Sequence, residues 1–339
     1  MNDIRFETVP VPRITAHDIL VQVAACGVCP TDIKKVQYGK VPPPRVFGHE
    51  TAGTIVRVGA RTRSLSVGDR VALHHHVPCL KSHACRHRAF AQCPQCKRIG
   101  IAAGFEPAGG GYAEYVPVMS FCLPGVVKIL KRNTLEEGAM LEPVNTVLKA
   151  VRRLNILRAY GIGQWPRTDR PDVHETASLQ GIKVVATDLM PARLKLAKKY
   201  GATTAAKPDQ PSLPKHVDRL TNSRGLDAAI VAVPVDAAVQ QATDLRRGAG
   251  QLLLIAHTKR DAKSAVDLST ICVDEKDLIG SHSADITLQP KVAKVVFSRK
   301  FDVRSLISHR LSLKQTQSAV DLAANPSSRS LKVMVTQPA

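Results

Sequence analysis

Four residues of this chain are of the types that hold a zinc ion while leaving one coordination position free. They are Cys29, His49, Glu50 and Glu142, and each lies in a short motif with glycine or proline beside it. A thiolate, an imidazole and a carboxylate around an open position are typical of catalytic zinc, whereas structural zinc is closed by four protein ligands. Such a zinc polarises a bound alcohol or water and lowers its pKa toward neutrality. The four residues therefore predict a catalytic zinc site.

Two neighbouring residues could act in the chemistry at this zinc. Thr31 follows Cys29 by two positions, and its hydroxyl could take the proton from a zinc-bound hydroxyl group. Glu50 is either a fourth ligand that exchanges with water or a carboxylate outside the coordination shell that sets the field of the site. The residues alone leave both roles of Glu50 open.

The composition is that of a basic globular protein. The chain has 339 residues, enough for two domains, and a formal net charge of +20. A basic surface attracts nucleic acid, anionic membranes or anionic substrates, but here lysine and arginine are spread along the whole chain and aromatic residues make up only 4%. No apolar run approaches the roughly 20 residues that span a bilayer. We therefore interpret the charge as a solvated surface and expect no nucleic-acid or membrane partner.

The cysteines favour metal binding. The segment up to Pro12 mixes polar and apolar side chains and does not resemble a signal peptide, so we expect a cytoplasmic protein. In that compartment, cysteines clustered beside histidines indicate metal ligands more often than disulfide bonds, and a disulfide framework is the less favoured alternative. The eight cysteines are Cys26, Cys29, Cys79, Cys85, Cys93, Cys96, Cys122 and Cys272.

Short strand-like segments, separated by glycine and proline, fill the first 120 residues. They predict a compact, irregular β domain. The segments are Ile19 to Ala25, Gly53 to Val58, Arg70 to Leu73 and Tyr112 to Val118.

From about residue 144, strands and helices alternate. Apart from Lys183 and Thr187 the run 182–187 is apolar, as in a buried parallel strand, and a helical pattern follows from Pro191 until Gly201 stops it. A second strand, helix and strand occupy 226–256. Repeated units of this kind predict a doubly wound parallel sheet.

The last segment carries a helical pattern near 290–297 and a closing strand at 331–335. We expect residues 1–143 and 286–339 to form one domain and 144–285 to form the other.

The order Cys-x-Thr-Asp, then Gly-His-Glu, then Glu-Pro resembles the zinc-containing medium-chain dehydrogenase/reductase family of the alcohol dehydrogenase superfamily, in its threonine and sorbitol dehydrogenase branch. Three further pieces carry the likeness, namely Val67 to Val71, Gly110 to Tyr115 and Gly138 to Pro143. It extends from Ile4 to the end of the chain. The resemblance implies an α/β fold, with an irregular β (GroES-like) catalytic domain and a dinucleotide-binding domain, and hydride transfer from an alcohol to a nicotinamide dinucleotide.

Members of the family that hold a structural zinc use four cysteines spaced Cys-x2-Cys-x2-Cys-x7-Cys. The matching positions here are Cys79, Ser82, Cys85 and Cys93. Serine is a poor zinc ligand, so one corner of the four-thiolate site is broken. Cys96 or His83 could substitute for it.

Asp188 and Arg193 are the candidate dinucleotide-binding residues. An acidic residue at the end of the second strand of a dinucleotide fold hydrogen-bonds the ribose hydroxyls and disfavours a 2′-phosphate, so Asp188 favours NAD over NADP. The alternative is an ordinary aspartate at a helix N-cap.

The segment 159–177 departs most from the family, which places its first central strand and a Gly-x-Gly-x-x-Gly turn there. Those glycines let the backbone approach the pyrophosphate at a helix N-terminus. Here two prolines and scattered charge surround a lone Gly161-x-Gly163 pair. We therefore expect this segment to lack the strand and to be unable to build the phosphate site as written.

A local frameshift is one hypothesis for this departure. Codons allowed for 160–177, read one nucleotide further on, give Thr-Val-Leu-Val-(Ser or Asn)-Gly-Gln-Gly-Pro-Ile-Gly-Leu-Met-Phe-Thr-Arg-Leu-Leu. This is an apolar strand, a glycine turn and a helix start in the right order, and the Trp165 codon forces one of the glycines. The nucleotide sequence tests the hypothesis.

The leading interpretation is a zinc-dependent oxidoreductase that passes hydride from an alcohol, a polyol or a hydroxy amino acid to NAD. The second is a catalytically impaired relative that binds zinc but has a defective dinucleotide site. A zinc-containing nucleic-acid binder comes last. The resemblance implies a homodimer or homotetramer, and the substrate is left open within the three classes.

Overall fold

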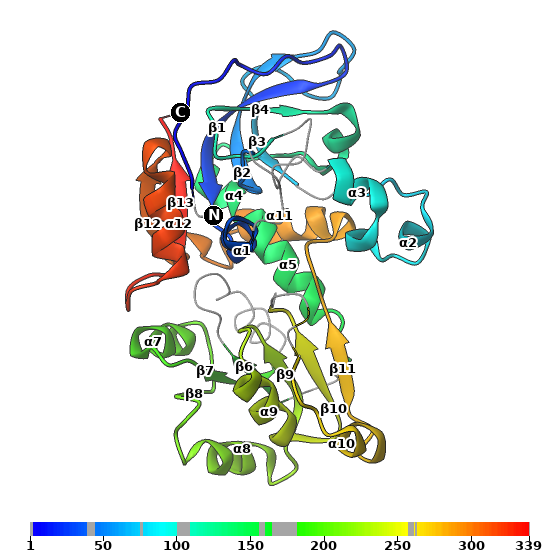
Figure 1. The fold of residues 1–339 in the computed structure, drawn as a ribbon, viewed down its shortest axis with the longest axis vertical. Coiled ribbons are helices and arrows are strands. Elements are labelled where there is room, and N and C mark those ends of the chain that lie inside the picture. The colour runs from blue at the N-terminus through cyan, green and yellow to red at the C-terminus, as the bar shows by residue number, and fades with distance from the viewer. Residues whose placement is uncertain are drawn as a thin grey trace. The chain divides into compact units, whose positions relative to one another are not determined.

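The computed structural model describes residues 3–38, 45–74, 77–99, 109–155, 160–164, 182–256, 261 and 263–338. The chain divides into two compact units (Figure 1). Unit 1 contains Met1–Thr146 and Ser283–Ala339, and unit 2 contains Val147–His282.

Unit 1 is built on a seven-stranded sheet in the order β12-β13-β1-β2-β3-β5, with β4 also paired to β1. Every pairing is antiparallel except that of β12 with β13. The strands are β1 (Ile19–Gly27), β2 (Glu50–Val58), β3 (Arg70–Leu73), β4 (Tyr115–Val118), β5 (Val127–Lys128), β12 (Ile307–Ser312) and β13 (Lys332–Thr336).

The strand β1 organises unit 1, because it pairs with β2, β13 and β4. Eight of its nine residues are buried, which follows from a sequence that is almost continuously apolar. Side chains at Ile19, Val21 and Val23 enter one core with β2, β3 and β4. The helices of this unit are α1 (Pro30–Tyr38), α2 (His83–Arg86), α3 (Pro94–Ile99), α4 (Leu135–Ala139), the first half of α5 (Leu141–Val151), α11 (Gln289–Phe297) and α12 (Thr316–Ala324).

Unit 2 has a parallel six-stranded sheet in the order β8-β7-β6-β9-β10-β11. In chain order this is 3-2-1-4-5-6, the arrangement of doubly wound dinucleotide-binding folds. Its strands are β6 (Tyr160–Gln164), β7 (Lys183–Thr187), β8 (Thr204–Ala206), β9 (Leu226–Val231), β10 (Arg246–Leu254) and β11 (Asp277–Gly280). Within its described residues, the α-helices after α5 are α7 (Pro191–Lys199), α8 (Leu213–Thr221), α9 (Asp236–Asp244) and α10 (Leu268–Val273).

Successive residues of the central strand β9 face opposite cores. Ala229 and Val231 pack with α8 and α9, whereas Ile230 packs with the second half of α5. This alternation follows from the two-residue period of a strand, and it places helices on both faces of the sheet. The predicted α/β class, with an irregular β domain and a doubly wound parallel sheet, is confirmed.

The centre of the sheet corrects one expectation. We expected segment 159–177 to lack a strand, but β6 lies between β7 and β9, with Gly161 opposite Val184 on one side and Ala228 on the other. Backbone hydrogen bonds to two apolar neighbours hold this strand, and those neighbours lie far away in sequence. The glycine turn expected after it falls in 165–181, outside the described residues.

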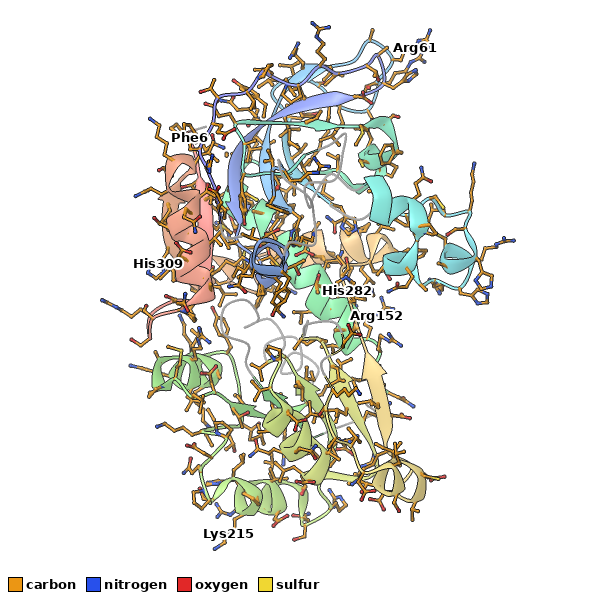
Figure 2. All side chains as sticks on the ribbon, in the orientation of Figure 1. Phe6, Arg61, Arg152, Lys215, His282 and His309 are labelled. Atoms are coloured by element: carbon orange, nitrogen blue, oxygen red, sulfur yellow. The ribbon has the colours of Figure 1, made fainter. Side chains whose placement is uncertain are left out.

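The basic residues are dispersed over the surface of both units. Figure 2 labels Arg61 and Lys215, which are exposed and belong to unit 1 and unit 2 respectively, and the exposed Arg152 at the end of α5. Among the described residues, no helix is both long and apolar enough to cross a lipid bilayer.

Glu137 ties two distant segments of unit 1 together. Its carboxylate accepts hydrogen bonds from Arg299 Nε at 2.9 Å, from the Thr134 backbone N–H at 2.6 Å and from Asn133 Nδ2 at 3.0 Å. Burial alone would raise the pKa of Glu137, but these donors outweigh burial and lower it to about 2. Since the ordinary value is 4.5, the ionised carboxylate stabilises the fold.

We predict that Glu137→Gln lowers the free energy of unfolding by on the order of 2 kcal/mol near neutral pH, allowing for the partial exposure of Arg299. The contribution of a carboxylate with a lowered pKa is complete above its unfolded-state pKa and is lost as pH falls toward its folded-state pKa. The difference in the free energy of unfolding between Glu137→Gln and the native chain should therefore become smaller below about pH 4.5. Urea unfolding at several pH values measures it.

Glu136→Gln is the matched control, because Glu136 forms a more exposed pair with Arg310. It should change the free energy of unfolding by less than about 1 kcal/mol. Equal effects of the two variants would contradict the role given to Glu137.

Candidate active site

Three of the predicted zinc ligands meet in unit 1. One ligand atom each from Cys29, His49 and Glu50 lies within 4.8 Å of the other two, and His49 and Glu50 are buried. The pairing of β1 with β2 causes this, because Gly27 at the end of β1 lies opposite Glu50 at the start of β2. Sulfur, nitrogen and oxygen donors at this spacing fit zinc.

Asp32 orients the imidazole of His49. Its Oδ1 lies 3.0 Å from His49 Nδ1, and both side chains are almost fully buried. With Nδ1 held in this way, Nε2 is the nitrogen available to a metal. Burial lowers the pKa of His49, but the charges of Asp32 and Cys29 outweigh burial and raise the pKa well above its usual value.

Tyr112 completes this arrangement from another segment. Its hydroxyl donates to Asp32 Oδ2 at 3.1 Å and also lies 3.3 Å from the Gly27 carbonyl oxygen. The Cys29 backbone N–H donates to the same Asp32 oxygen at 3.4 Å. Asp32 is therefore hydrogen-bonded on both oxygens, which fixes the carboxylate that in turn fixes His49.

Gly48 permits this packing. Its φ is +97°, and a Cβ there would lie 2.7 Å from Cys26 Sγ and 2.9 Å from the Tyr112 backbone nitrogen. Only glycine fits this conformation and this space. Cys26 itself is fully buried, and burial raises the pKa of its thiol to about 12, so it packs as a neutral group while Cys29 lies in the cluster.

A buried cation accompanies Glu50. Lys332 Nζ of β13 lies 2.5 Å from Glu50 Oε2, with both side chains 1% exposed, and it donates to the Val28 carbonyl oxygen at 3.0 Å. A Cβ on Gly27 would lie 1.9 Å from the same Glu50 oxygen. The absence of a side chain at Gly27 is thus what lets the ion pair form.

The other two residues predicted for this site lie on helices. Glu142 is buried in the first turn of α5, where its Oε1 accepts from Thr146 Oγ1 at 3.0 Å, and it is not part of the group within 4.8 Å. Thr31 lies in the first turn of α1 and is half-buried. Both roles stay predictions.

Asp188 lies directly after β7, where β6 and β7 end side by side with Gln164 opposite Thr187. It accepts from the Met190 backbone N–H at 2.7 Å, and its Oδ2 lies 3.7 Å from Arg193 NH1. Burial, the largest influence, raises its pKa. The N-cap residue of α7 is Met190, so Asp188 is not the ordinary N-cap of the alternative interpretation.

The sulfur atoms of Cys79, Cys85 and Cys93 form a second group within 4.8 Å. Hydrogen bonds from the backbone N–H groups of Lys81 and Ser82 lower the pKa of Cys79 to about 6. Cys96 and His83, considered as substitutes for the missing cysteine, are not in this group. A four-cysteine zinc site does not fit these residues.

Sequence reasoning assigned no role to Lys332, to Asp32 or to the Tyr112 hydroxyl. Lys332 had one signal, since it is a lone charge beside an apolar run in a closing strand. Asp32 stands three positions after Cys29, but only the fold shows that it faces His49.

We predict that Lys332→Met lowers the free energy of unfolding by about 3–5 kcal/mol, because Glu50 then loses its buried cation. Adding Glu50→Gln should recover a large part of that loss, and the double-mutant cycle measures the coupling. Lys128→Met, at the exposed pair with Asp69, is the control and should cost less than about 1 kcal/mol. Simple additivity of the Lys332 and Glu50 variants would contradict the ion pair.

Comparisons with known proteins agree with this geometry. Two family descriptions match the chain, "Alcohol dehydrogenase GroES-like domain" over residues 15–126 and "Zinc-binding dehydrogenase" over residues 173–298. The sorbitol dehydrogenase of Bombyx mori is 30% identical over 351 residues, which cover 98% of this chain and 95% of that protein. The sorbitol dehydrogenase of Bacillus subtilis (strain 168) is 29% identical over 344 residues, with coverage of 98% and 94%.

A solved structure of a putative zinc-binding dehydrogenase from Sinorhizobium meliloti 1021, bound to NADP, has a TM-score of 0.87 and 25% identity. It covers 99% of this chain, and this chain covers 96% of it. The likeness therefore extends over both units and over the segments that carry the cysteine, histidine and glutamate cluster. The chain belongs to the zinc-containing medium-chain dehydrogenase/reductase family.

Proposed function

We propose that this protein is a zinc- and NAD-dependent oxidoreductase that removes hydride from the carbinol carbon of an alcohol or polyol. The observation that carries the proposal is the cluster of half-buried Cys29 with buried His49 and Glu50, in which Asp32 orients His49. Both relatives named above are sorbitol dehydrogenases, which favours a polyol over a hydroxy amino acid as the substrate.

Zinc bound at this cluster would polarise the alcohol oxygen and lower its pKa. Cys29 and His49 would hold it, with Glu142 as a third ligand supplied by α5. Asp32 keeps the His49 tautomer that presents Nε2. The Thr31 hydroxyl takes the proton that leaves the alcohol.

For Glu50 we propose the role outside the coordination shell. Lys332 Nζ is already 2.5 Å from Glu50 Oε2 in a buried site, so a metal would compete with this cation for the same carboxylate. The pair places a balanced charge beside the cluster, whereas a free carboxylate would add a full negative charge to it.

The coenzyme we propose is NAD. The buried Asp188 carboxylate stands at the edge of the sheet where doubly wound folds bind dinucleotides, and there it would accept from ribose hydroxyls and repel a 2′-phosphate. Arg193, beside it, would balance part of this charge. In this proposal residues 1–143 and 286–339 bind the metal and the alcohol, and residues 144–285 bind the coenzyme.

The alternative of an impaired relative rested on two features of segment 159–177, the missing central strand and the missing glycine turn. The first reason no longer applies, because β6 is present. The alternative now depends on the turn alone.

Calorimetric titration of the full chain with NAD, with zinc measured on the same sample, tests the proposal. We expect dissociation constants on the order of micromolar to tens of micromolar, followed by NADH formation with a polyol such as sorbitol. Zinc retention without NAD binding would instead support the impaired relative. Binding of NADP but not of NAD would contradict the role of Asp188.

We predict that Asp32→Asn weakens zinc binding at the cluster by about 10- to 100-fold and reduces turnover with it, because His49 loses the acceptor that orients it. Asp69→Asn, in a surface pair with Lys128, is the matched control and should retain zinc and turnover. Zinc retention is measured by titrating each chain with a chelator. If Asp32→Asn lost its zinc at the same chelator concentration as the native chain, this would contradict the role of Asp32.

We also propose a cytoplasmic protein that assembles as a homodimer or homotetramer. The eight cysteines, all of which lie in the described part of the chain, form no disulfide bond, which suits a reducing compartment. Light scattering on the purified chain measures the assembly.

A further inference from the structure

The segment from Cys79 to Cys96, here called the cysteine lobe, holds three sulfur atoms in an arrangement that the four-cysteine pattern does not describe. It contains α2 and the first half of α3, and Figure 1 draws both helices in cyan to the side of the strands of unit 1. Its hydrophobic core is one small cluster, made of Cys85, Phe90, Cys93 and Cys96 with Cys79 packed against it. A core of this size stabilises little, so a bound ion would contribute much of the stability of the lobe.

The sulfur spacing already suits a metal. Cys79 Sγ lies 3.9 Å from Cys85 Sγ and 3.5 Å from Cys93 Sγ. Three thiolates on one tetrahedral zinc, each about 2.3 Å from it, would lie about 3.8 Å apart. These distances are far longer than a disulfide bond, so the three thiols converge without being linked to one another.

Backbone N–H groups point at the sulfurs. The Ser82 N–H donates to Cys79 Sγ at 3.3 Å, and the Cys79 N–H donates to Cys93 Sγ at 3.4 Å. Donors of this kind favour the thiolate, which is the form that binds metal. The backbone N–H of Cys96 also donates to Cys93, so Cys96 contributes to the lobe through its main chain while its sulfur lies outside the group of three.

Ser82 occupies the corner where a fourth cysteine would stand. Its Oγ accepts from the Cys85 backbone N–H at 3.3 Å and so caps the N-terminus of α2. Its side chain also hydrogen-bonds to Cys79 and to Cys85. A neutral hydroxyl that is already hydrogen-bonded to these groups is a weak metal ligand. Ser82 is half-buried, so solvent reaches the side of the three sulfurs on which it lies.

His83 does not fill the corner. It is exposed, and its ring lies 4.3 Å from the ring of His87, centroid to centroid. Within the described part of the chain, the ligand atoms that come together in the lobe are the three sulfurs.

We propose that Cys79, Cys85 and Cys93 form a three-thiolate site for soft metal ions, with an exchangeable fourth position beside Ser82. Zinc there takes water or a small thiol as its fourth ligand and exchanges readily. Ions that prefer three sulfur ligands need no fourth one, so the site favours them over zinc. The site lies outside the zinc cluster of Cys29 and His49, and it does not depend on the proposed activity.

Arsenite, As(OH)3, is the sharpest probe, because trivalent arsenic binds three thiolates in a trigonal pyramid. Three S–H bonds and three As–O bonds break, three As–S bonds form, and three waters leave, with no change of oxidation state. The cluster of Cys29, His49 and Glu50 offers one thiol and cannot complete this reaction, so the probe reports on the lobe alone.

The first experiment measures intact mass and zinc content of the full chain with and without arsenite, under reducing conditions. We expect one arsenic per chain and loss of any zinc from the lobe. Cys93→Ser should abolish arsenic binding, and Cys272→Ser, at an exposed cysteine of unit 2, should leave it unchanged. Absence of arsenic on the native chain, or its persistence in Cys93→Ser, would overturn the proposal.

The second experiment restores the missing corner with Ser82→Cys. We expect this variant to keep lobe zinc at a chelator concentration that strips it from the native chain, with a shift of at least about 10-fold, and to resist displacement by arsenite. With cobalt in place of zinc, the sulfur-to-metal charge-transfer absorption should increase from the three-thiolate to the four-thiolate site. Equal zinc retention by both chains would show that another side chain already closes the site, and this would overturn the proposal.

Discussion

The ion pair between Glu50 and Lys332 is the interaction on which unit 1 depends. It joins the start of β2 to the start of β13, and both strands flank β1. Burying either charge alone would be strongly unfavourable, so β13 must dock in one register for the pair to form. That register also places the Lys332 ammonium against the Val28 carbonyl oxygen, one residue before Cys29. The position of the cluster cysteine is therefore set by electrostatics as well as by strand pairing.

A chain of neighbouring residues and hydrogen bonds connects this ion pair to the rest of the site. Glu50 is next to His49, His49 meets Asp32, and Asp32 is held by Tyr112 and by the backbone of Cys29. Glu50, His49 and Asp32 are buried and Tyr112 is half-buried, and each has a partner in the chain. A buried network that is satisfied in this way gives a single arrangement of side chains, which is what a metal site with a defined open position needs.

Much of the fold could be predicted from local sequence patterns, because the apolar strands β1, β7 and β9 are recognisable from their own residues. The strand β6 could not, since its place depends on β7 and β9, which lie later in the chain. Cys29, His49 and Glu50 were recognisable by residue type and spacing as members of one candidate site. Lys332 was not, because its contact with Val28 spans 304 positions and leaves no local pattern.

The long sequence separation within the ion pair has a consequence for biosynthesis. Glu50 leaves the ribosome early, whereas Lys332 belongs to a strand that is translated after the whole of unit 2. A nascent chain therefore carries a carboxylate that cannot yet be neutralised in the interior. Until β13 arrives, the end of β1 that pairs with it, Ala25 to Gly27, is an open sheet edge accessible to a chaperone. Unit 2 is continuous in sequence and can complete its fold first, so the order of translation sets the order in which the two units mature.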